Sequence, residues 1–181
     1  DDYTTIISVF PTGNLKKSQK TNSYMTKAIK KGSIVIQRHS MKIRGKEYCR
    51  WIDDSYLMVG RAYFYKGEFE EAINTFNYVK NEYDKNEIRF NASLWLIRGY
   101  IEKGDFSSAG SELEELLSNK NFPKKMEKEL ALIASDFYVR KKDFTAATSE
   151  LLNATKLIRN KRKKVRLNYI LAQIYQDLNN H

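Results

Sequence analysis

The feature that most constrains the fold of this chain is a repeat whose Phe anchors lie 37 and 38 residues apart. Three segments align without gaps: YFYKGEFEEAINTF (residues 63–76), YIEKGDFSSAGSEL (100–113) and YVRKKDFTAATSEL (138–151). Each runs from Tyr through Lys-Gly or Lys-Lys, an acid and Phe to an Ala and an apolar residue four positions later. A partial fourth unit follows around Tyr175. Repeats of this length are typical of solenoids whose units bury their apolar faces against one another.

Each unit has the pattern of two antiparallel helices. In the first unit, one predicted helical face has the spacing i, i+3, i+4 and i+7, and consists of Tyr56, Val59, Gly60 and Tyr63. The matching face after the turn consists of Ala72, Phe76 and Val79. We expect Gly67 and Gly104 to adopt positive φ where a helix ends. The acids after the turns, Glu68, Asp105 and Asp143, are expected at the start of the next helix, where free N–H groups favour a carboxylate.

This pattern resembles the tetratricopeptide repeat, closely in the first unit and less closely in the next two. The resemblance implies an all-α fold, a tetratricopeptide-like helical-hairpin solenoid of about three and a half units plus a divergent N-terminal segment. We expect repeats at approximately residues 53–86, 90–123 and 128–160, with a partial unit at 165–181, inside a repeat domain of residues 23–181. Residues 1–22 are expected to be an extended N-terminal segment, and the chain to be a fragment of a longer protein.

The inventory of reactive side chains argues against an enzyme. Asp53 and Asp54 are adjacent, so on a helix they point about 100° apart, and both fall where acids favour a helix start. With Cys49 the only cysteine and two histidines in the chain, no metal-ligand cluster can be assembled. The glycines are isolated and form no phosphate-binding loop. We therefore expect a non-enzymatic protein without a cofactor or a small-molecule substrate.

The first helices of the units are the expected place for a binding site, because in tetratricopeptide arrays they line the concave groove. Carried over to this chain, the candidate groove comprises Asp54, Leu57, Arg61, Phe64, Asn91, Leu94, Arg98, Ile101, Leu132, Asp136, Tyr169 and Gln173. The same rule also includes Glu129, Val139, Arg166 and Gln176. An apolar row bordered by Arg61 and Arg98 suits an extended or helical peptide that carries carboxylates. Alternatively, the apolar residues belong partly to the core and both arginines pair with nearby acids.

The net charge of +10 is concentrated in two segments. Residues 16–50 contain 11 Lys and Arg against one acid, and residues 156–166 contain seven and no acid. The candidate basic patch comprises Lys27, Lys30, Lys31, Arg38, Arg159, Lys161, Arg162, Lys163 and Lys164. Such segments attract nucleic acid, acidic lipid or an acidic protein face, or they are solvated helix faces.

The segment before and at the start of the first repeat is more specific than a generic repeat. RHSM, GKE and RWIDDSYLMVGRAYFY resemble the SprE/PorW gliding-motility and type IX secretion lipoproteins of Bacteroidota, over roughly residues 24–180. The letters that carry the resemblance are Arg38, His39, Ser40, Met41, Gly45, Lys46, Arg50, Trp51, Ile52, Asp53 and Asp54. The resemblance implies a scaffold that links the secretion translocon with ring and motor parts, held by a lipid anchor outside this fragment to the periplasmic face of the outer membrane.

Two other functions remain open at the level of the sequence. One is a generic peptide-binding repeat adaptor with no role in secretion. The other is a nucleic-acid-binding helical repeat, for which the basic segments would supply phosphate contacts and a steep dependence on salt. We place it last, because the aromatic residues that would stack on bases fall mostly on predicted core faces.

Overall fold

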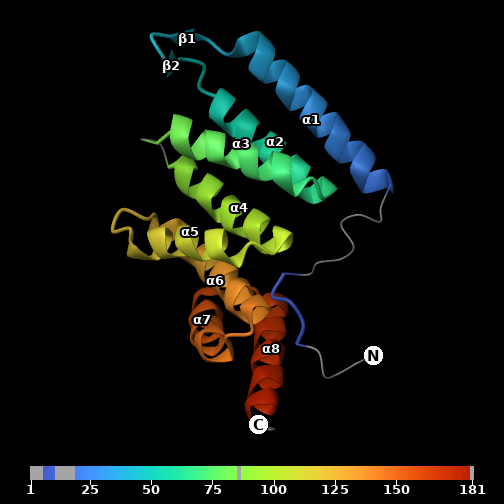
Figure 1. The fold of residues 1–181 in the computed structure, drawn as a ribbon, viewed down its shortest axis with the longest axis vertical. Helices are drawn as coiled ribbons and strands as arrows, with labels where there is room; N and C mark the ends of the chain where they lie inside the picture. Colours follow the sequence, from blue (N-terminus) through green and yellow to red (C-terminus); the bar gives the residue numbers. More distant parts are fainter. Residues whose placement is uncertain (1–5, 11–18, 85–86, 180–181) are drawn as a thin grey trace. The chain divides into compact units, whose positions relative to one another are not determined.

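The computed structural model describes residues 6–10, 19–84 and 87–179, and these are predominantly helical (Figure 1). The chain divides into a larger unit, residues 13–112, and a smaller unit, residues 1–12 and 113–181. The α-helices are α1 (Gln19–His39), α2 (Ile52–Lys66), α3 (Phe69–Glu82), α4 (Ile88–Lys103), α5 (Phe106–Ser118), α6 (Glu127–Lys141), α7 (Phe144–Leu157) and α8 (Lys161–Asn179). A single 3₁₀ turn, η1 (Lys124–Met126), precedes α6. The boundary between the two units falls inside α5.

In the larger unit, each of the helices α1 to α4 packs against its neighbour in sequence, and α2 also contacts α4. The close approach of α2 and α3 depends on Gly60, because a Cβ added there would lie 2.5 Å from the ring of Phe76. Phe76 is fully buried and stacks on Trp95 of α4 with ring centroids 5.9 Å apart. One aromatic ring therefore joins three consecutive helices, as the small and large positions of the repeat predict.

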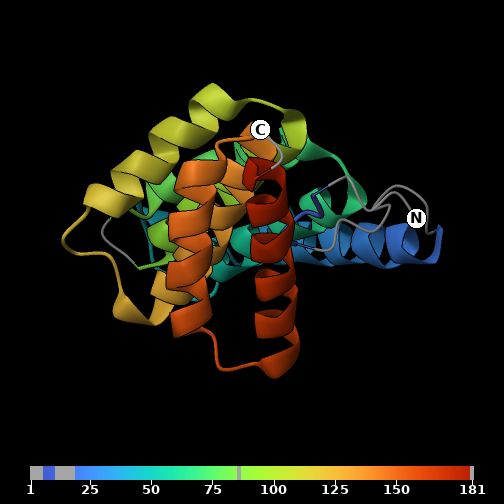
Figure 2. The same ribbon diagram turned by 90° about the horizontal axis from the view of Figure 1, so that it is seen from below.

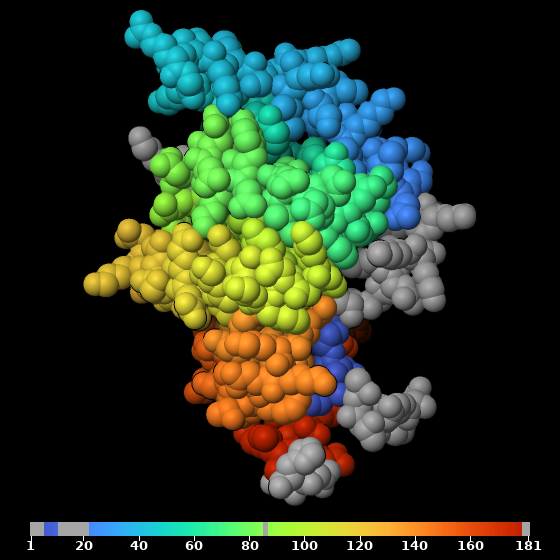
Figure 3. Space-filling model, in the orientation of Figure 1, coloured from blue at the N-terminus to red at the C-terminus, as the bar shows by residue number. Residues whose placement is uncertain are grey.

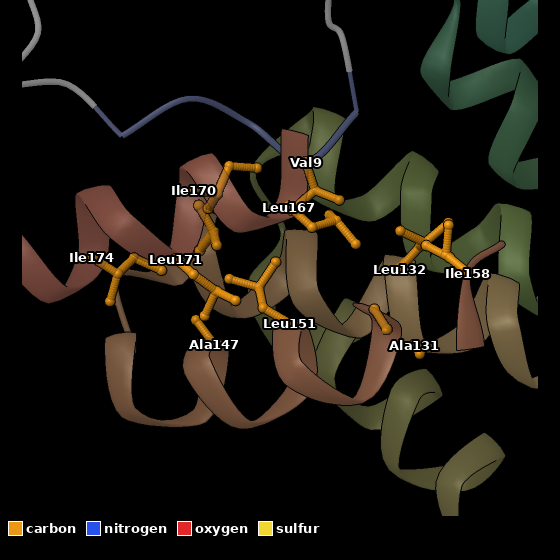
Figure 4. Close-up of a cluster of buried hydrophobic side chains, with 12 residues drawn as sticks. Val9, Ala131, Leu132, Ala147, Leu151, Ile158, Leu167, Ile170, Leu171 and Ile174 are labelled. Atoms are coloured by element: carbon orange, nitrogen blue, oxygen red, sulfur yellow. The ribbon is translucent and has the colours of Figure 1, made fainter. Parts of the chain in front are cut away.

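The smaller unit is a second helical assembly with its own core. α7 packs against both α6 and α8, and Figure 2 shows α7 and α8 side by side. The core contains Leu151 of α7 and Leu167, Ile170 and Ile174 of α8, all fully or almost fully buried (Figure 4). Consecutive helical hairpins of the expected length thus occur in both units, and the predicted all-α, tetratricopeptide-like solenoid class is confirmed.

The turn between the two helices of each hairpin uses a left-handed residue. Gly67 and Gly104 have φ of 84° and 82°, and the amide N–H groups of these residues and their successors close the preceding helix. In the third hairpin the same position is Lys142, with φ of 63°. A Cβ is disfavoured in this conformation, so the third turn is held at a conformational cost that the first two avoid.

Replacing Lys142 by Gly is expected to raise the free energy of unfolding by about 0.5–1 kcal/mol, because glycine adopts positive φ without steric conflict. Lys142 is exposed, so the substitution removes little packing. Lys141→Gly is the matched control: it is the last residue of α6, and a glycine there should instead lower the free energy of unfolding. Urea denaturation followed by circular dichroism measures both. Equal destabilisation by the two substitutions would contradict the role given to the turn.

Two of the three acids expected at helix starts cap a helix with their side chains. Asp143 Oδ1 accepts a hydrogen bond from the amide of Ala146 at 3.1 Å, and Asp105 Oδ1 accepts one from the amide of Ser108 at 3.0 Å. The hydrogen bonds from Ser108 hold the pKa of Asp105 below its usual value. Glu68 makes no such cap and forms an ion pair with Lys66 at 2.7 Å.

A short antiparallel hairpin, β1 (Lys42–Ile43) and β2 (Lys46–Glu47), connects α1 and α2. Its turn, Arg44-Gly45, has two positive φ angles, 51° and 78°. Glu47 holds the hairpin in place by accepting hydrogen bonds from Ser40 Oγ and from the amides of Met41 and Cys49, at 2.5, 2.9 and 2.8 Å. Burial acts to raise the pKa of Glu47, but these hydrogen bonds outweigh it and the pKa lies below its usual value.

The N-terminal segment is described only in part. Residues 6–10 are non-helical, as expected for residues 1–22, but α1 begins at Gln19, inside that range. The remainder of the expected extended segment lies outside the described residues. α1 precedes the first repeat, where the sequence indicated a divergent segment, and it packs against α2.

Candidate protein-binding surfaces

The candidate groove residues of the larger unit divide into exposed and buried sets. Asp54 and Arg61 are exposed, whereas Leu57, Asn91 and Arg98 are half-buried. The buried set, Phe64, Leu94 and Ile101, has exposed fractions of 3% or less and offers almost no surface to a ligand. The alternative that some of these apolar residues belong to the core therefore describes the buried set.

Arg61 of α2 and Arg98 of α4 both lie on the indole of Trp95. Their guanidinium carbons are 5.0 and 4.3 Å from the indole centroid, and that of Arg98 is also 4.9 Å from the ring of Phe64. Trp95 is 6% exposed, as expected of a core residue. Stacking on an aromatic face holds a guanidinium in a fixed orientation, and its planar donor geometry matches a carboxylate. This pair is the best-organised cationic feature of the candidate groove in the larger unit.

In the smaller unit, candidate groove residues of α6 and α8 contact the N-terminal segment. Asp136 Oδ1 accepts hydrogen bonds from the amides of Val9 and Phe10 at 3.0 and 3.5 Å. Gln173 Oε1 accepts one from the amide of Ile7 at 3.2 Å. Arg166 donates from Nε to the carbonyl of Val9 at 3.1 Å, and from Nη2 to the carbonyl of Ser8 at 2.7 Å. Residues 6–10 therefore lie across α6 and α8 and are bound to both helices through the main chain.

Side chains of the same segment pack on the apolar core of the smaller unit. Val9 is 4% exposed and belongs to the core cluster with Leu132 and Leu167, as Figure 4 shows. Ile6, Ile7 and Phe10 are partly buried against that cluster. In the space-filling view, the blue segment rests directly on the orange surface of α6 (Figure 3). Among the other candidates of this unit, Tyr169 is 46% exposed and Val139 is buried.

The charge of the buried acid of this site, Asp136, is balanced by an ion pair within α6. Asp136 is 3% exposed, and its Oδ2 lies 3.1 Å from Nε of Arg140, one helical turn further along α6. A pocket of about 390 Å³ adjoins the segment, and its lining includes Phe10, Leu132 and Leu167 together with the basic residues Arg162 and Lys163. Two members of the candidate basic patch therefore border the surface that holds residues 6–10.

The other residues of the candidate basic patch are exposed and fall into two groups, one on α1 and one around the start of α8. Lys27, Lys30, Lys31 and Arg38 lie along α1 in the larger unit, whereas Arg159, Lys161 and Lys164 lie at or before the start of α8 in the smaller unit. The first turn of α8 contains no acid. Positive charge at a helix N-terminus opposes the helix dipole, so this cluster weakens the helix that carries it.

The acid pair beside Trp51 does not form a shared site. Asp53 is half-buried, and its Oδ1 accepts a hydrogen bond from the amide of Asp54 at 2.8 Å, while Asp54 is exposed. Burial raises the pKa of Asp53. Among the described residues, no group of three or more His, Cys, Asp or Glu side chains is placed to hold a metal ion. No described helix combines the length and the apolar character that crossing a membrane requires.

Comparison with known proteins supports a binding role. Residues 53–77 match the tetratricopeptide repeat family, and this range covers α2, the turn at Gly67 and most of α3. A search of curated proteins gives no match. Tetratricopeptide repeats are typically parts of non-enzymatic scaffolds that bind other proteins, and the chain is accordingly interpreted as a protein–protein interaction scaffold.

Sequence reasoning missed two features of these surfaces. The first is the β1–β2 hairpin. Gly45, in a two-residue connection between two short segments, is a recognisable turn signal. The second is the docking of residues 6–10, which depends on partners more than 120 residues away and has no local signal.

Proposed function

We propose that this scaffold is a component of a type IX secretion and gliding-motility machine, where it links translocon and ring or motor parts at the periplasmic face of the outer membrane. The proposal is supported by the resemblance of residues 24–180 to the SprE/PorW lipoproteins. The tetratricopeptide match over residues 53–77 agrees with it, because it indicates a protein-binding role. A lipid anchor outside these residues would provide the attachment to the membrane.

The residues that carry the resemblance gather in one part of the larger unit: the end of α1, the hairpin and the start of α2. Several large apolar side chains of this region are exposed, including Met41 at 55% and Trp51 at 63%. Tyr48 and Ile43 are also at least half exposed. Exposed apolar side chains that gather in one region are typical of a surface that another protein covers. Their position therefore favours a partner contact at the hairpin over a role in the core.

Site-specific photo-crosslinking in native envelopes tests this proposal. A photoreactive residue at position 51 of the full-length protein is expected to crosslink to a translocon or ring protein, identified by mass spectrometry. In the control, the photoreactive residue replaces Lys128, which is exposed on α6. Recovery of the protein in the soluble cytosolic fraction, or crosslinks only to proteins outside the secretion machinery, would leave the generic adaptor as the better function.

The arginine pair on Trp95 gives a second test, directed at the groove. Arg61→Glu together with Arg98→Glu is expected to weaken binding of the crosslinked partner by roughly tenfold or more, since a carboxylate ligand would meet like charge. Binding is measured by titration of the purified partner. Lys120→Glu with Lys124→Glu, exposed and outside the groove, is the matched control. If binding survives the reversal at Trp95, the groove interpretation is wrong and the basic residues of α1 and α8 become the better candidates.

A further inference from the structure

The contacts between the smaller unit and residues 6–10 are those of a receptor with an extended peptide. The five described hydrogen bonds from α6 and α8 to the segment go to its main chain: three amides and two carbonyls. The residues that make them, Asp136, Arg166 and Gln173, occupy the first helices of successive repeats, where groove residues are expected. Main-chain recognition holds an extended backbone largely regardless of its side chains.

Selectivity at this site comes from the side chains of the segment. Val9 is almost completely buried in the cluster that contains Leu132 and Leu167, so this position favours an apolar residue. Ile7 and Phe10 lie on the rim and are only partly buried. An extended peptide with a branched residue followed by an aromatic one therefore fits the site, and a charged residue at the position of Val9 is excluded.

We propose that the surface formed by α6 and α8 is a binding site for an extended apolar peptide of a partner protein, and that residues 6–10 are an intramolecular ligand that competes for it. This inference rests on the scaffold function proposed above. A ligand within the same chain has an effective concentration in the millimolar range when its linker allows binding. A partner must therefore displace the segment, and the apparent affinity for any external peptide is lowered while residues 6–10 occupy the site.

To be displaced, the segment must exchange its contacts with the smaller unit for those of a partner peptide. Its described contacts are five main-chain hydrogen bonds and the packing of four apolar side chains, of which only Val9 is almost completely buried. A partner peptide with the same backbone contacts and a larger apolar complement would bind more strongly. The adjoining pocket of about 390 Å³, with Arg162 and Lys163 on its rim, offers additional surface for such a peptide.

The test uses the full chain and a fluorescein-labelled peptide with the sequence of residues 1–12, DDYTTIISVFPT. In the Val9→Asp protein the intramolecular segment cannot remain docked, so we expect the labelled peptide to bind at least roughly tenfold more tightly than it binds the wild type. Binding is measured by fluorescence anisotropy, and circular dichroism verifies that the variant is folded. A peptide carrying the same Val9→Asp change is the negative control.

Two further variants keep the test decisive. Ile7→Asp disturbs a half-buried residue and should give a smaller gain in peptide affinity, which preserves the measurement if Val9→Asp fails to fold. Adding Arg166→Ala to either variant should weaken peptide binding about fivefold or more by removing two hydrogen bonds. Lys156→Ala, at an exposed position of α7 outside the surface formed by α6 and α8, is the matched control and should change binding by less than about twofold.

The possible outcomes separate this proposal from its alternatives. Equal binding of the peptide to wild type and to both opened variants, or no binding to any of them, would overturn the competition. A wild-type chain that is dimeric by light scattering and becomes monomeric on Val9→Asp would show that the segment of a second copy fills the site, which also overturns it. None of these results depends on the secretion machinery, so failure here is distinguishable from failure of the crosslinking experiment.

Discussion

Replacing Phe76 by Ala is expected to lower the free energy of unfolding of the larger unit by about 3–5 kcal/mol. The ring is fully buried, rests against the backbone of Gly60 and stacks on Trp95, so its removal leaves a cavity between α2, α3 and α4. Phe69→Ala, at a half-buried aromatic position of the same helix, is the matched control and should cost clearly less. Urea denaturation with circular dichroism measures both.

A double-mutant cycle isolates the contact with Gly60. Gly60→Ala should destabilise by about 1–3 kcal/mol, because the new methyl would overlap the ring of Phe76. In a chain that already carries Phe76→Leu, the same change should cost less, since the smaller side chain leaves room for the methyl. Additive effects would mean that the two positions do not interact, and a loss below about 1 kcal/mol for Phe76→Ala would contradict its place in the core.

The second large effect is expected at Asp136. Asp136→Ala should cost about 3–5 kcal/mol, because it removes a buried carboxylate that pairs with Arg140 and accepts a hydrogen bond from the Val9 amide. Asp136→Asn keeps an acceptor and should cost less. Thermal and urea denaturation of the full chain, followed by circular dichroism, provide the measurement.

Asp54→Ala is the matched control for Asp136, since both acids were placed in the candidate groove by the same repeat rule. Asp54 is exposed in the first turn of α2, where a carboxylate contributes less than about 1 kcal/mol through the helix dipole. If the two substitutions lowered the free energy of unfolding by similar amounts, burial would not be the property that distinguishes the two acids.

The helical hairpins were predictable because their signals are local. The spacing of Tyr56, Val59, Gly60 and Tyr63 fixes one helix face, and Lys-Gly before an acid marks the turn. Lys142 shows where the local signal stops: the position remains left-handed although its side chain no longer favours that conformation. The packing of the repeat imposes the turn, and the residue tolerates it.

The candidate site was harder to predict, because the repeat rule assigns a helix face without assigning exposure. Phe64, Leu94 and Ile101 have the spacing of groove residues, yet they are buried. Asp136 was selected as a groove acid, but its partners are an arginine one turn away and amides of the distant N-terminal segment. Contacts of that kind arise from tertiary packing and do not produce a periodic pattern in the sequence.

The docking of residues 6–10 also sets an order of events during synthesis. Arg166, which holds the carbonyl of Val9, is translated 157 residues after it. At about 5–20 residues per second, this separation corresponds to roughly 10–30 s. Throughout that interval the ribosome-bound chain presents Ile6, Ile7, Val9 and Phe10 without the helix that covers them. These four apolar side chains therefore remain available to a chaperone until α8 has been synthesised.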